Sequence, residues 1–507
     1  MSAVPLQVIH WSSQAPFPLL GALQLLPLLG ALLLFLLRRH GWAVYLGQAL
    51  AAFEVGLAAL LYRTLERHSP ALQLAERVDL LGPLGYHAAA DGVTVLFVVL
   101  CAVLTLLLTV YAAERRLPDQ VLLLGAILGV EAVLMSALAT VNLMWFVLAG
   151  AVELGCLGYL LWRWAATAEK DLALARFYHF QGTGLLLLLA GTLILGWLHA
   201  DVRGGRWSFD LVDLAGLPVP GTLGAVVFFL LFYGLGVRTP LFPFHGWLPI
   251  VAQHGNLAIG PTFLLGIKIG IYGMVRFVFP LLPQAVDAWH FYAVGFAAAG
   301  VFYAAVLAFL QTDLRRLLAF AVISHTSLTV IGLFTLHPTA LQGALLLSVN
   351  FGLAATTMLF MVGFVFRRTG TTALSELGGL FDRLPLIGGA FLVSGLAIVG
   401  MPGTPGFDAV HLVLEASIAR YGALLTVASA LGNVLAAGFL LLAFQRAFLR
   451  SRADHLQSLV IERASAMETA LAVAVIVLQL VIGFWLDPWL DLIEAPLRLL
   501  SAPFAPV

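Results

Sequence analysis

GVTVLFVVLCAVLTLLLTVYAA, residues 92–113, contains no charged side chain and no proline. A helix rises about 1.5 Å per residue, so a helix of this length crosses roughly 30 Å, the thickness of the hydrocarbon core of a membrane. A soluble helix of this length needs a charged or strongly polar face, and this stretch has none. We therefore interpret residues 92–113 as a transmembrane helix.

The composition of the whole chain agrees with this interpretation. Hydrophobic residues make up 61% of the 507 residues and charged residues only 10%, whereas a soluble domain carries about 25% charged residues. The formal net charge is zero, which gives no indication of a nucleic-acid partner. The lipid bilayer is the environment that fits such a chain.

Comparable apolar stretches recur from end to end, so we predict an all-α polytopic membrane protein with about fourteen transmembrane helices. We expect the spans near residues 17–37, 42–62, 92–113, 120–139, 141–163, 177–199, 221–243, 257–279, 289–311, 313–335, 340–366, 385–418, 421–449 and 466–486.

Basic residues are concentrated on the connections that follow odd-numbered spans. Sixteen of the 26 lie there: Arg38, Arg39, Arg115, Arg116, Arg163, Lys170, Arg176, Arg315, Arg316, Arg367, Arg368, Arg383, Arg446, Arg450, Arg452 and Arg463. Because cytoplasmic loops of membrane proteins are enriched in Lys and Arg, these connections are expected to face the cytoplasm. Both termini would then face outward.

Two predicted spans contain helix-breaking residues: GVRTPLFPFHGWLP at 236–249 and VGMPGTPGF at 399–407. Proline removes a backbone donor, and the freed groups survive in lipid only where protein or water satisfies them. The breaks fall in the fourth helix of two five-helix blocks, spans 4–8 and 9–13, which indicates inverted repeats with an ion site between them. The alternative is a pair of ordinary proline kinks.

The repeats divide the chain into four predicted parts. The expected divisions are N-terminal helices over 1–116, a first repeat over 117–280, a second repeat over 285–450, and a C-terminal helix and tail over 451–507.

Lys268, one of only two lysines, lies in the middle of the span PTFLLGIKIGIYGMVRF. A lysine in the bilayer costs several kcal/mol, on the order of 3, unless it is paired or hydrated, and such residues commonly mark proton or ion pathways. Snorkelling to an interface is the alternative, but Lys268 lies about ten residues from either end of its span. We expect it to take up and release a proton.

Three further ionisable residues are predicted to act with Lys268. Glu131 and Glu153 are carboxylates in the middle of spans, and Arg238 adjoins the first break. An arginine stays charged, so Arg238 is expected to anchor Glu153 and not to carry protons itself. The alternative for the two glutamates is a structural hydrogen bond between helices.

Histidine titrates near neutrality and suits a proton pathway, and four histidines lie in or beside spans: His245, His254, His325 and His411. Each has as its alternative an ordinary hydrogen-bonding role. Asp408, His411 and Glu415 follow the second break at helical spacing, which favours the outward end of a half-channel over a solvated helix end. Glu54 is assigned no role.

Several motifs carry a resemblance to the antiporter-like subunits of respiratory complex I, which are related to multisubunit cation/proton antiporters. They are TPLFPFHGWLP (239–249), GIYGMVRF (270–277) after the buried lysine, QTDLRRLLAFAVISHTSLTVIG (311–332), YHAAADGVTVLFVVL (86–100), MPGTPGF (401–407) and WLDPWLDLI (485–493). The lysine-bearing eighth helix and the lack of a long lateral C-terminal helix resemble the M-type subunit more than the L-type.

The resemblance implies redox-driven proton pumping in the bacterial cytoplasmic membrane. Lys268 matches the central relay lysine of the family, Glu131 the fourth-helix glutamate, and His245 and His325 family histidines. No phosphate loop, dinucleotide fingerprint or metal-ligand spacing is present in the sequence. No cofactor is therefore expected in this chain, and quinone, flavin and iron–sulfur clusters would belong to partner membrane-complex subunits.

The chain departs from the family pattern at several positions. Ala151 stands at the fifth-helix glutamate position, with Glu153 about 200° further around the helix. Arg238 replaces the usual lysine, Phe351 stands where a histidine is expected, and Val410 occupies the twelfth-helix charged position. The proton pathway is thus partly rewritten.

Three functions stay open from the sequence. The first is a proton-translocating subunit of a complex I-like NADH/quinone oxidoreductase. The second is the same scaffold coupled to a membrane-bound hydrogenase, a cation/proton antiporter that moves Na⁺, or an inorganic-carbon pump. The third is a structural paralogue that no longer conducts.

Overall fold

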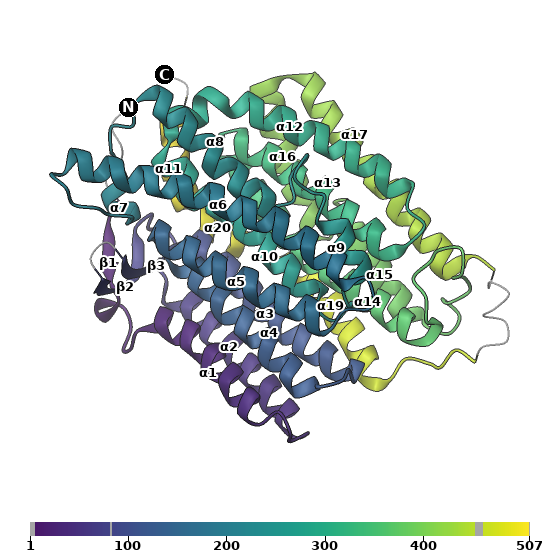
Figure 1. Ribbon diagram of the computed structural model, residues 1–507. Helices are drawn as coiled ribbons and strands as arrows, with labels where there is room; N and C mark the ends of the chain where they lie inside the picture. Colours follow the sequence, from purple (N-terminus) through teal and green to yellow (C-terminus); the bar gives the residue numbers. More distant parts are fainter. Residues whose placement is uncertain (1–5, 82–83, 452–459, 506–507) are drawn as a thin grey trace.

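A computed structural model describes residues 6–81, 84–451 and 460–505. Within these ranges, thirteen helices are long and apolar enough to cross a membrane, and they pack side by side in one bundle (Figure 1). They are α1 (Leu19–Leu36), α2 (Ala43–Thr64), α3 (Gly92–Arg115), α4 (Gln120–Ala139), α5 (Leu143–Arg163), α6 (Lys170–Val202), α8 (Gly221–Arg238), α10 (Gly260–Gly273) continued by the π-turn Met274–Val278 and by α11 (Phe279–Leu281), α12 (Pro283–Phe309), α13 (Leu314–Phe334), α14 (Pro338–Thr369), α17 (Ala423–Phe444) continued by the π-turn Gln445–Leu449, and α19 (Ala466–Phe484). The chain is a multi-pass membrane protein, as the sequence predicts.

Both predicted interruptions are present. The seventh span ends with α8 at Arg238, and a turn leads into the short helix α9 (Leu248–His254). The span expected at 385–418 is two helices, the apolar α15 (Pro385–Ile398) and α16 (Pro405–Tyr421). Glycine and proline cause these breaks, since Gly400 and Gly403 adopt positive φ angles of 76° and 85°, which other residues rarely adopt.

Side chains satisfy backbone groups that the interruptions free. At the first, the indole nitrogen of Trp247 donates to the carbonyl of Val237 at 3.0 Å. At the second, the amide of Asn350 donates to the carbonyl of Ala397 at 2.9 Å. The two gaps therefore meet the requirement that the bilayer imposes on irregular backbone.

One end of the bundle carries a small sheet that the sequence predictions do not include. Strands β1 (Val8–His10), β2 (Leu72–Leu81) and β3 (Leu84–Ala90) pair in that order, β1 parallel and β3 antiparallel to β2. On β2, the Glu76 carboxylate accepts hydrogen bonds from the backbone N–H groups of Leu20 and Gly21 at 2.8 and 2.9 Å. The sheet thereby closes the N-terminal end of α1, where four N–H groups lack helical partners.

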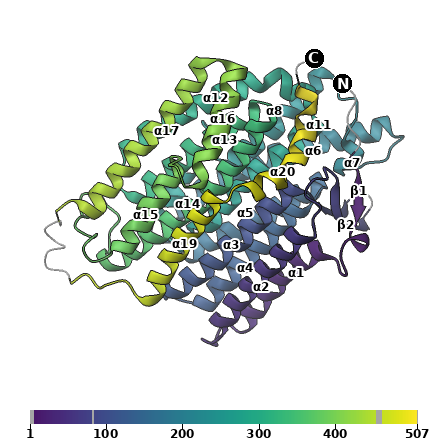
Figure 2. The ribbon, with the colours of Figure 1, turned by 180° about the vertical axis from the view of Figure 1, so that it is seen from behind.

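The C-terminal helix α20 (Asp487–Ser501) follows α19 across the back of the molecule and contacts α3 and α14 (Figure 2). Its close approach depends on Gly92 at the start of α3. A Cβ atom there would lie 1.6 Å from the carbonyl oxygen of Leu492. The remaining short elements are α7 (Leu211–Leu214) and the 3₁₀ turns Trp11–Ser13 and Ala502–Phe504.

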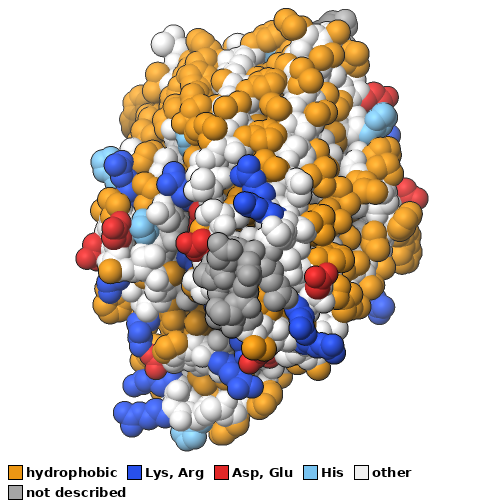
Figure 3. Space-filling view, turned by 90° about the vertical axis from the view of Figure 1, so that its right-hand side faces the viewer, with side chains coloured by type: hydrophobic (Ala, Val, Ile, Leu, Met, Phe, Trp, Pro, Cys, Tyr) orange, Lys and Arg blue, Asp and Glu red, His pale blue; other side chains and the backbone are white. Residues whose placement is uncertain are grey.

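Several of the expected cytoplasmic connections meet at the other end of the bundle. Arg367 at the end of α14 pairs with Glu114 at the end of α3 at 3.3 Å, and Arg368 pairs with Glu468 at the start of α19. On the face shown in Figure 3, Lys and Arg side chains are spread below a largely hydrophobic region. Arg452, which belongs to the predicted basic set, lies outside the described residues.

Candidate functional site

Lys268 lies on α10 and is buried, with only 5% of its surface exposed. Its Nζ atom stands 5.0 Å from the centre of the Phe351 ring on α14, and a Cβ atom on Gly352 would lie 3.3 Å from its Cε atom. Among the described residues Lys268 forms no ion pair. The expected burial is confirmed, and the side chain does not snorkel to a membrane face.

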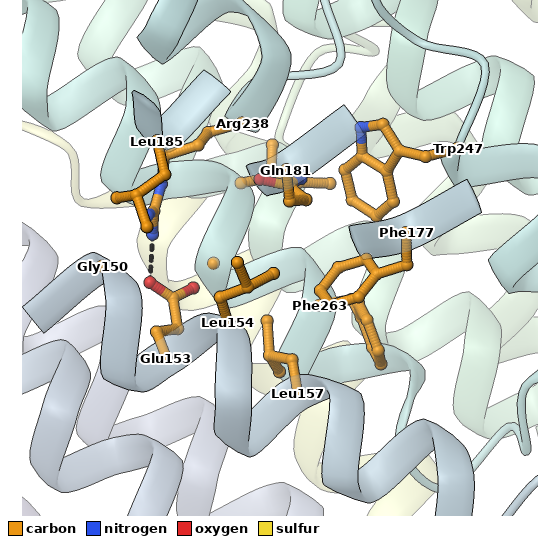
Figure 4. A pocket seen from close by; sticks show the side chains of 12 residues that line it. Gly150, Glu153, Leu154, Leu157, Phe177, Gln181, Leu185, Arg238, Trp247 and Phe263 are labelled. Atoms are coloured by element: carbon orange, nitrogen blue, oxygen red, sulfur yellow. Dashed lines mark hydrogen bonds and ion pairs between the residues drawn. The ribbon is translucent and has the colours of Figure 1, made fainter. Parts of the chain in front are cut away.

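Beside the lysine helix, Glu153 of α5 and Arg238 of α8 form a buried ion pair (Figure 4). Two glycines make room for it: a Cβ on Gly150 would lie 2.6 Å from an Arg238 nitrogen, and a Cβ on Gly266 would lie 2.4 Å from a Glu153 oxygen. Gly266 is half a turn before Lys268 on α10. The predicted anchoring of Glu153 by Arg238 is therefore confirmed, and it takes place against the helix that carries the lysine.

A small pocket opens beside this ion pair, with a cavity volume of about 20 Å³ (Figure 4). Its polar lining comes from Glu153, Arg238 and Gln181, and the rest is mainly apolar, including Phe177 and Phe263. A space of this kind can hold water when it offers several polar partners. A water molecule in this pocket could therefore contact the ion pair, although both side chains are buried.

The fifth helix explains why the carboxylate sits at 153. Ala151 is exposed on the outer surface of the bundle, whereas Glu153 is buried. Two residues correspond to about 200° around a helix, so a carboxylate at 151 would point away from Arg238. The shift in position preserves an inward-facing acid in this chain.

His325 on α13 is a second titratable neighbour of the Phe351 ring. The His325 and Phe351 rings stack with centroids 5.2 Å apart and planes inclined by 22°. His325 Nε2 and the hydroxyls of Thr326 and Ser348 are buried without hydrogen-bond partners in the described chain. Phe351 thus lies close to both titratable groups, Lys268 and His325.

Glu131 on α4 is 1% exposed, and neither carboxylate oxygen has a hydrogen-bond partner among the described residues. Glu54 on α2, which is assigned no role in the sequence analysis, is also 1% exposed, and its two carboxylate oxygens likewise have no hydrogen-bond partner among the described residues. Buried carboxylates without donors are rare because an unpaired charge is costly in a low-dielectric interior.

Two predicted histidines lie apart from the lysine. His245 sits in the turn between α8 and α9, stacked on Phe242, and its ring centre is 5.1 Å from that of Tyr303. His254, at the end of α9, lies 2.7 Å from the hydroxyl of Thr167 in the loop before α6.

The cluster after the second break does not join the buried set. His411 and Glu415 lie 4.0 Å apart on α16, as their spacing predicts, but their side chains are 70% and 67% exposed. Asp408 is half-buried. At the family's charged position, Val410 is buried and packs near Gly400.

A further buried ion pair is not among the sequence predictions. Arg276 donates to both Asp91 oxygens, at 2.6 and 2.9 Å, and to the hydroxyl of Tyr272 at 3.0 Å. Tyr272 in turn donates to the carbonyl of Leu138 on α4 at 2.6 Å. Both charged residues stand inside the family-like motifs, which is the one signal that points to them; the network ties α3, α4 and α10 together.

Comparison with known proteins agrees with this architecture. Residues 139–436 match the family described as "NADH:quinone oxidoreductase/Mrp antiporter, TM". The chain is 28% identical over 419 residues to NADH-quinone oxidoreductase subunit M of Escherichia coli K12, covering 80% of each chain, so the expected likeness to an M-type subunit is confirmed.

Solved structures share the fold. A chain of respiratory complex I from Thermus thermophilus aligns with a TM-score of 0.84 and 26% identity, covering 95% of this chain and 99% of that one. A chain of the Mrp complex from Dietzia aligns with a TM-score of 0.86 and 20% identity, covering 96% and 98%. Since the family match spans more than half of the sequence, the chain belongs to the NADH:quinone oxidoreductase/Mrp antiporter transmembrane family.

Proposed function

We propose that this chain is a proton-translocating membrane-arm subunit of a complex I-like NADH/quinone oxidoreductase. The observation that carries the proposal is Lys268, buried in the middle of the bundle without an ion-pair partner in the described chain. An ammonium group in that position is costly unless it exchanges its proton. The relatives supply the partner chemistry, because they are subunits of quinone oxidoreductases.

In this function the ion pair of Glu153 and Arg238 modulates the charge of the lysine. The pair lies against Gly266, half a turn from Lys268. A negative charge freed from Arg238 would favour the protonated lysine, and its capture by Arg238 would favour proton release. Glu131 contributes a further buried carboxylate on α4. His245 lies in the turn that follows Arg238 at the first interruption.

Protons leaving Lys268 would continue through His325 and reach the surface near Asp408, His411 and Glu415. The unpaired hydroxyls of Thr326 and Ser348 supply donors and acceptors for water along the first part of this route. On α16, His411 and Glu415 are exposed and Asp408 is half-buried, so we assign the three residues to a boundary with solvent or with a neighbouring membrane subunit.

We also propose the orientation and the internal symmetry. The basic connections that meet at one end of the bundle support a cytoplasmic placement of that end in a bacterial inner membrane, with both termini outside. The two interrupted helices support a first repeat over 117–280 and a second over 285–450, between the N-terminal helices of 1–116 and the C-terminal part from 451.

A second candidate is a paralogue that no longer conducts, and the position of Phe351 favours it. The ring contacts both Lys268 and His325 and carries no exchangeable proton. If the Phe351 ring keeps water out of the space around Lys268 and His325, the route ends at the lysine.

Replacing the lysine tests both candidates. The whole complex is purified with Lys268→Ala, reconstituted into vesicles, and assayed for electron transfer and for proton uptake on the same sample. Loss of proton uptake in an intact complex supports conduction through Lys268. The matched control is Lys170→Ala, which removes the only other lysine, at the start of α6, and should leave uptake unchanged.

Unchanged proton uptake in the Lys268→Ala vesicles would rule out the proposed relay and favour the paralogue. The same purification identifies the partners. Copurified flavin and iron–sulfur subunits support the quinone oxidoreductase; their absence would favour a cation/proton antiporter, a hydrogenase or an inorganic-carbon pump.

A further inference from the structure

A pair of buried acids stands apart from the lysine and its ion pair. Glu54 on α2 and Glu131 on α4 are each 1% exposed, and none of their four carboxylate oxygens has a hydrogen-bond partner in the described chain. Two other buried acids each pair with an arginine: Glu153 with Arg238, and Asp91 with Arg276. Glu54 and Glu131 form no ion pair among the described residues.

The packing of α2 against α4 brings the two carboxyl groups together. A Cβ on Gly47 of α2 would lie 3.0 Å from the side chain of Leu124 of α4. These two residues therefore lie at the same height along the bundle axis. Glu54 and Glu131 each follow by seven residues, or about two turns, and residues at that spacing share a helix face.

A contact between these two levels confirms that the helices keep the same register. Gly30 of α1 meets both Leu50 of α2 and Leu128 of α4, at 3.0 and 3.1 Å from its would-be Cβ. The two helices therefore run in the same direction, and the two acids reach the same depth. The two carboxyl groups are also close enough for their charges to interact.

The surroundings offer no group that would hold both acids ionised. Helix α1 has no charged residue, and α3 contributes Thr105 and the buried thiol of Cys101. A thiol carries no positive charge, so Cys101 cannot neutralise either acid. Two carboxylates in one apolar site do not both ionise, and such a pair titrates as a unit.

We propose that Glu54 and Glu131 form a proton-binding pair that stores at least one proton at neutral pH. The storage role in transport rests on the proposed function; the binding of the proton itself does not. Binding forms one O–H bond on a carboxylate oxygen and requires no co-reactant.

Infrared spectroscopy of the purified complex tests the pair, because a protonated carboxyl group has a carbonyl band that an ionised one lacks. At neutral pH the native protein should show such bands, with a shift on exchange into heavy water. Glu54→Gln and Glu131→Gln should each remove part of this signal and shift what is left, since the two groups interact. Glu66→Gln, at an exposed acid in the loop after α2, is the matched control and should change nothing.

Glutamine has the shape of a protonated glutamic acid, so both variants should keep the melting temperature of the native complex. A marked loss of stability would show that the acid is ionised and paired, and would overturn the proposal. So would unchanged carbonyl bands in both variants, or a change in only one of them. Loss of proton uptake in Lys268→Ala with the bands retained separates the two proposals, because the spectrum needs no turnover.

Discussion

At the first interrupted helix, charge lies inside the bundle. Trp247 donates to the free carbonyl of Val237, and the ion pair of Arg238 with Glu153 is buried directly beside the gap. The pocket next to it brings space for water to that ion pair.

At the second interrupted helix, neutral side chains donate to the freed carbonyl groups. The amides of Asn350 and Asn433 donate to the carbonyls of Ala397 and Val399 at 2.9 and 2.6 Å. Of the ionisable residues on α16, His411 and Glu415 are exposed and Asp408 is half-buried.

The difference shows that an interrupted membrane helix needs hydrogen-bond donors for its freed carbonyl groups. A buried charge is not needed for this purpose, and burying it costs free energy. Neutral donors repair the second gap: two asparagine amides, the hydroxyl of Thr404 and backbone N–H groups. The ion pair at the first gap therefore has another reason to be there, and its proximity to Lys268 supplies one. If this comparison is right, stability should depend far more on the ion pair than on either amide, and least on the exposed pair.

The largest expected effect is that of Arg238→Ala. It leaves the Glu153 carboxylate buried without a cation, which typically costs about 3–5 kcal/mol. Thermal unfolding of the purified protein in detergent measures it. The double variant Arg238→Leu with Glu153→Leu should recover most of the loss, because no charge is left unpaired.

An exposed ion pair provides the matched control. Arg163 pairs with Asp119 with side chains 38% and 47% exposed, and Arg163→Ala should cost less than about 1 kcal/mol. Equal losses for Arg238→Ala and Arg163→Ala would show that the interior pair is hydrated like a surface pair, and the comparison would fail.

Asn350→Ala should have an intermediate effect. It leaves the carbonyl of Ala397 buried without a donor, for which about 1–3 kcal/mol is expected. Gln311→Ala removes a half-buried amide that donates to the carbonyl of Leu307 at 2.8 Å, and water can replace that bond. If both variants unfold at the same temperature, water already fills the second gap and the amide is dispensable.

Hydropathy alone predicts the spans closely, because lipid imposes one requirement on every crossing helix. The predicted stretch 120–139 coincides with α4, and 92–113 falls within α3. Lys268 and Glu153 can be predicted to be buried from the sequence, because each lies in the middle of a long apolar stretch, far from both ends of its span. Proline and glycine spacing likewise locates both interruptions.

Contacts between distant segments are what the sequence does not show. Asp91 and Arg276 are 185 residues apart, and neither stretch of sequence indicates that the two side chains pair. The outward direction of His411 depends on how α16 packs against α14 and α17, which its own spacing does not reveal. The placement of Glu54 at the level of Glu131 is visible only once the contact of Gly47 with Leu124 sets the register of α2 against α4.

The smallest effect is expected from replacing both members of the exposed pair, His411→Gln with Glu415→Gln. An exposed pair one helical turn apart contributes about 0.2–0.5 kcal/mol, so unfolding of the isolated subunit should hardly change. In the assembled complex the same double variant should matter more, because ionisable side chains facing lipid are costly and a neighbouring membrane subunit would cover them. Equal, negligible effects in both preparations would place the pair in solvent, and a large loss in the isolated subunit would mean that α16 buries charge as the first interruption does.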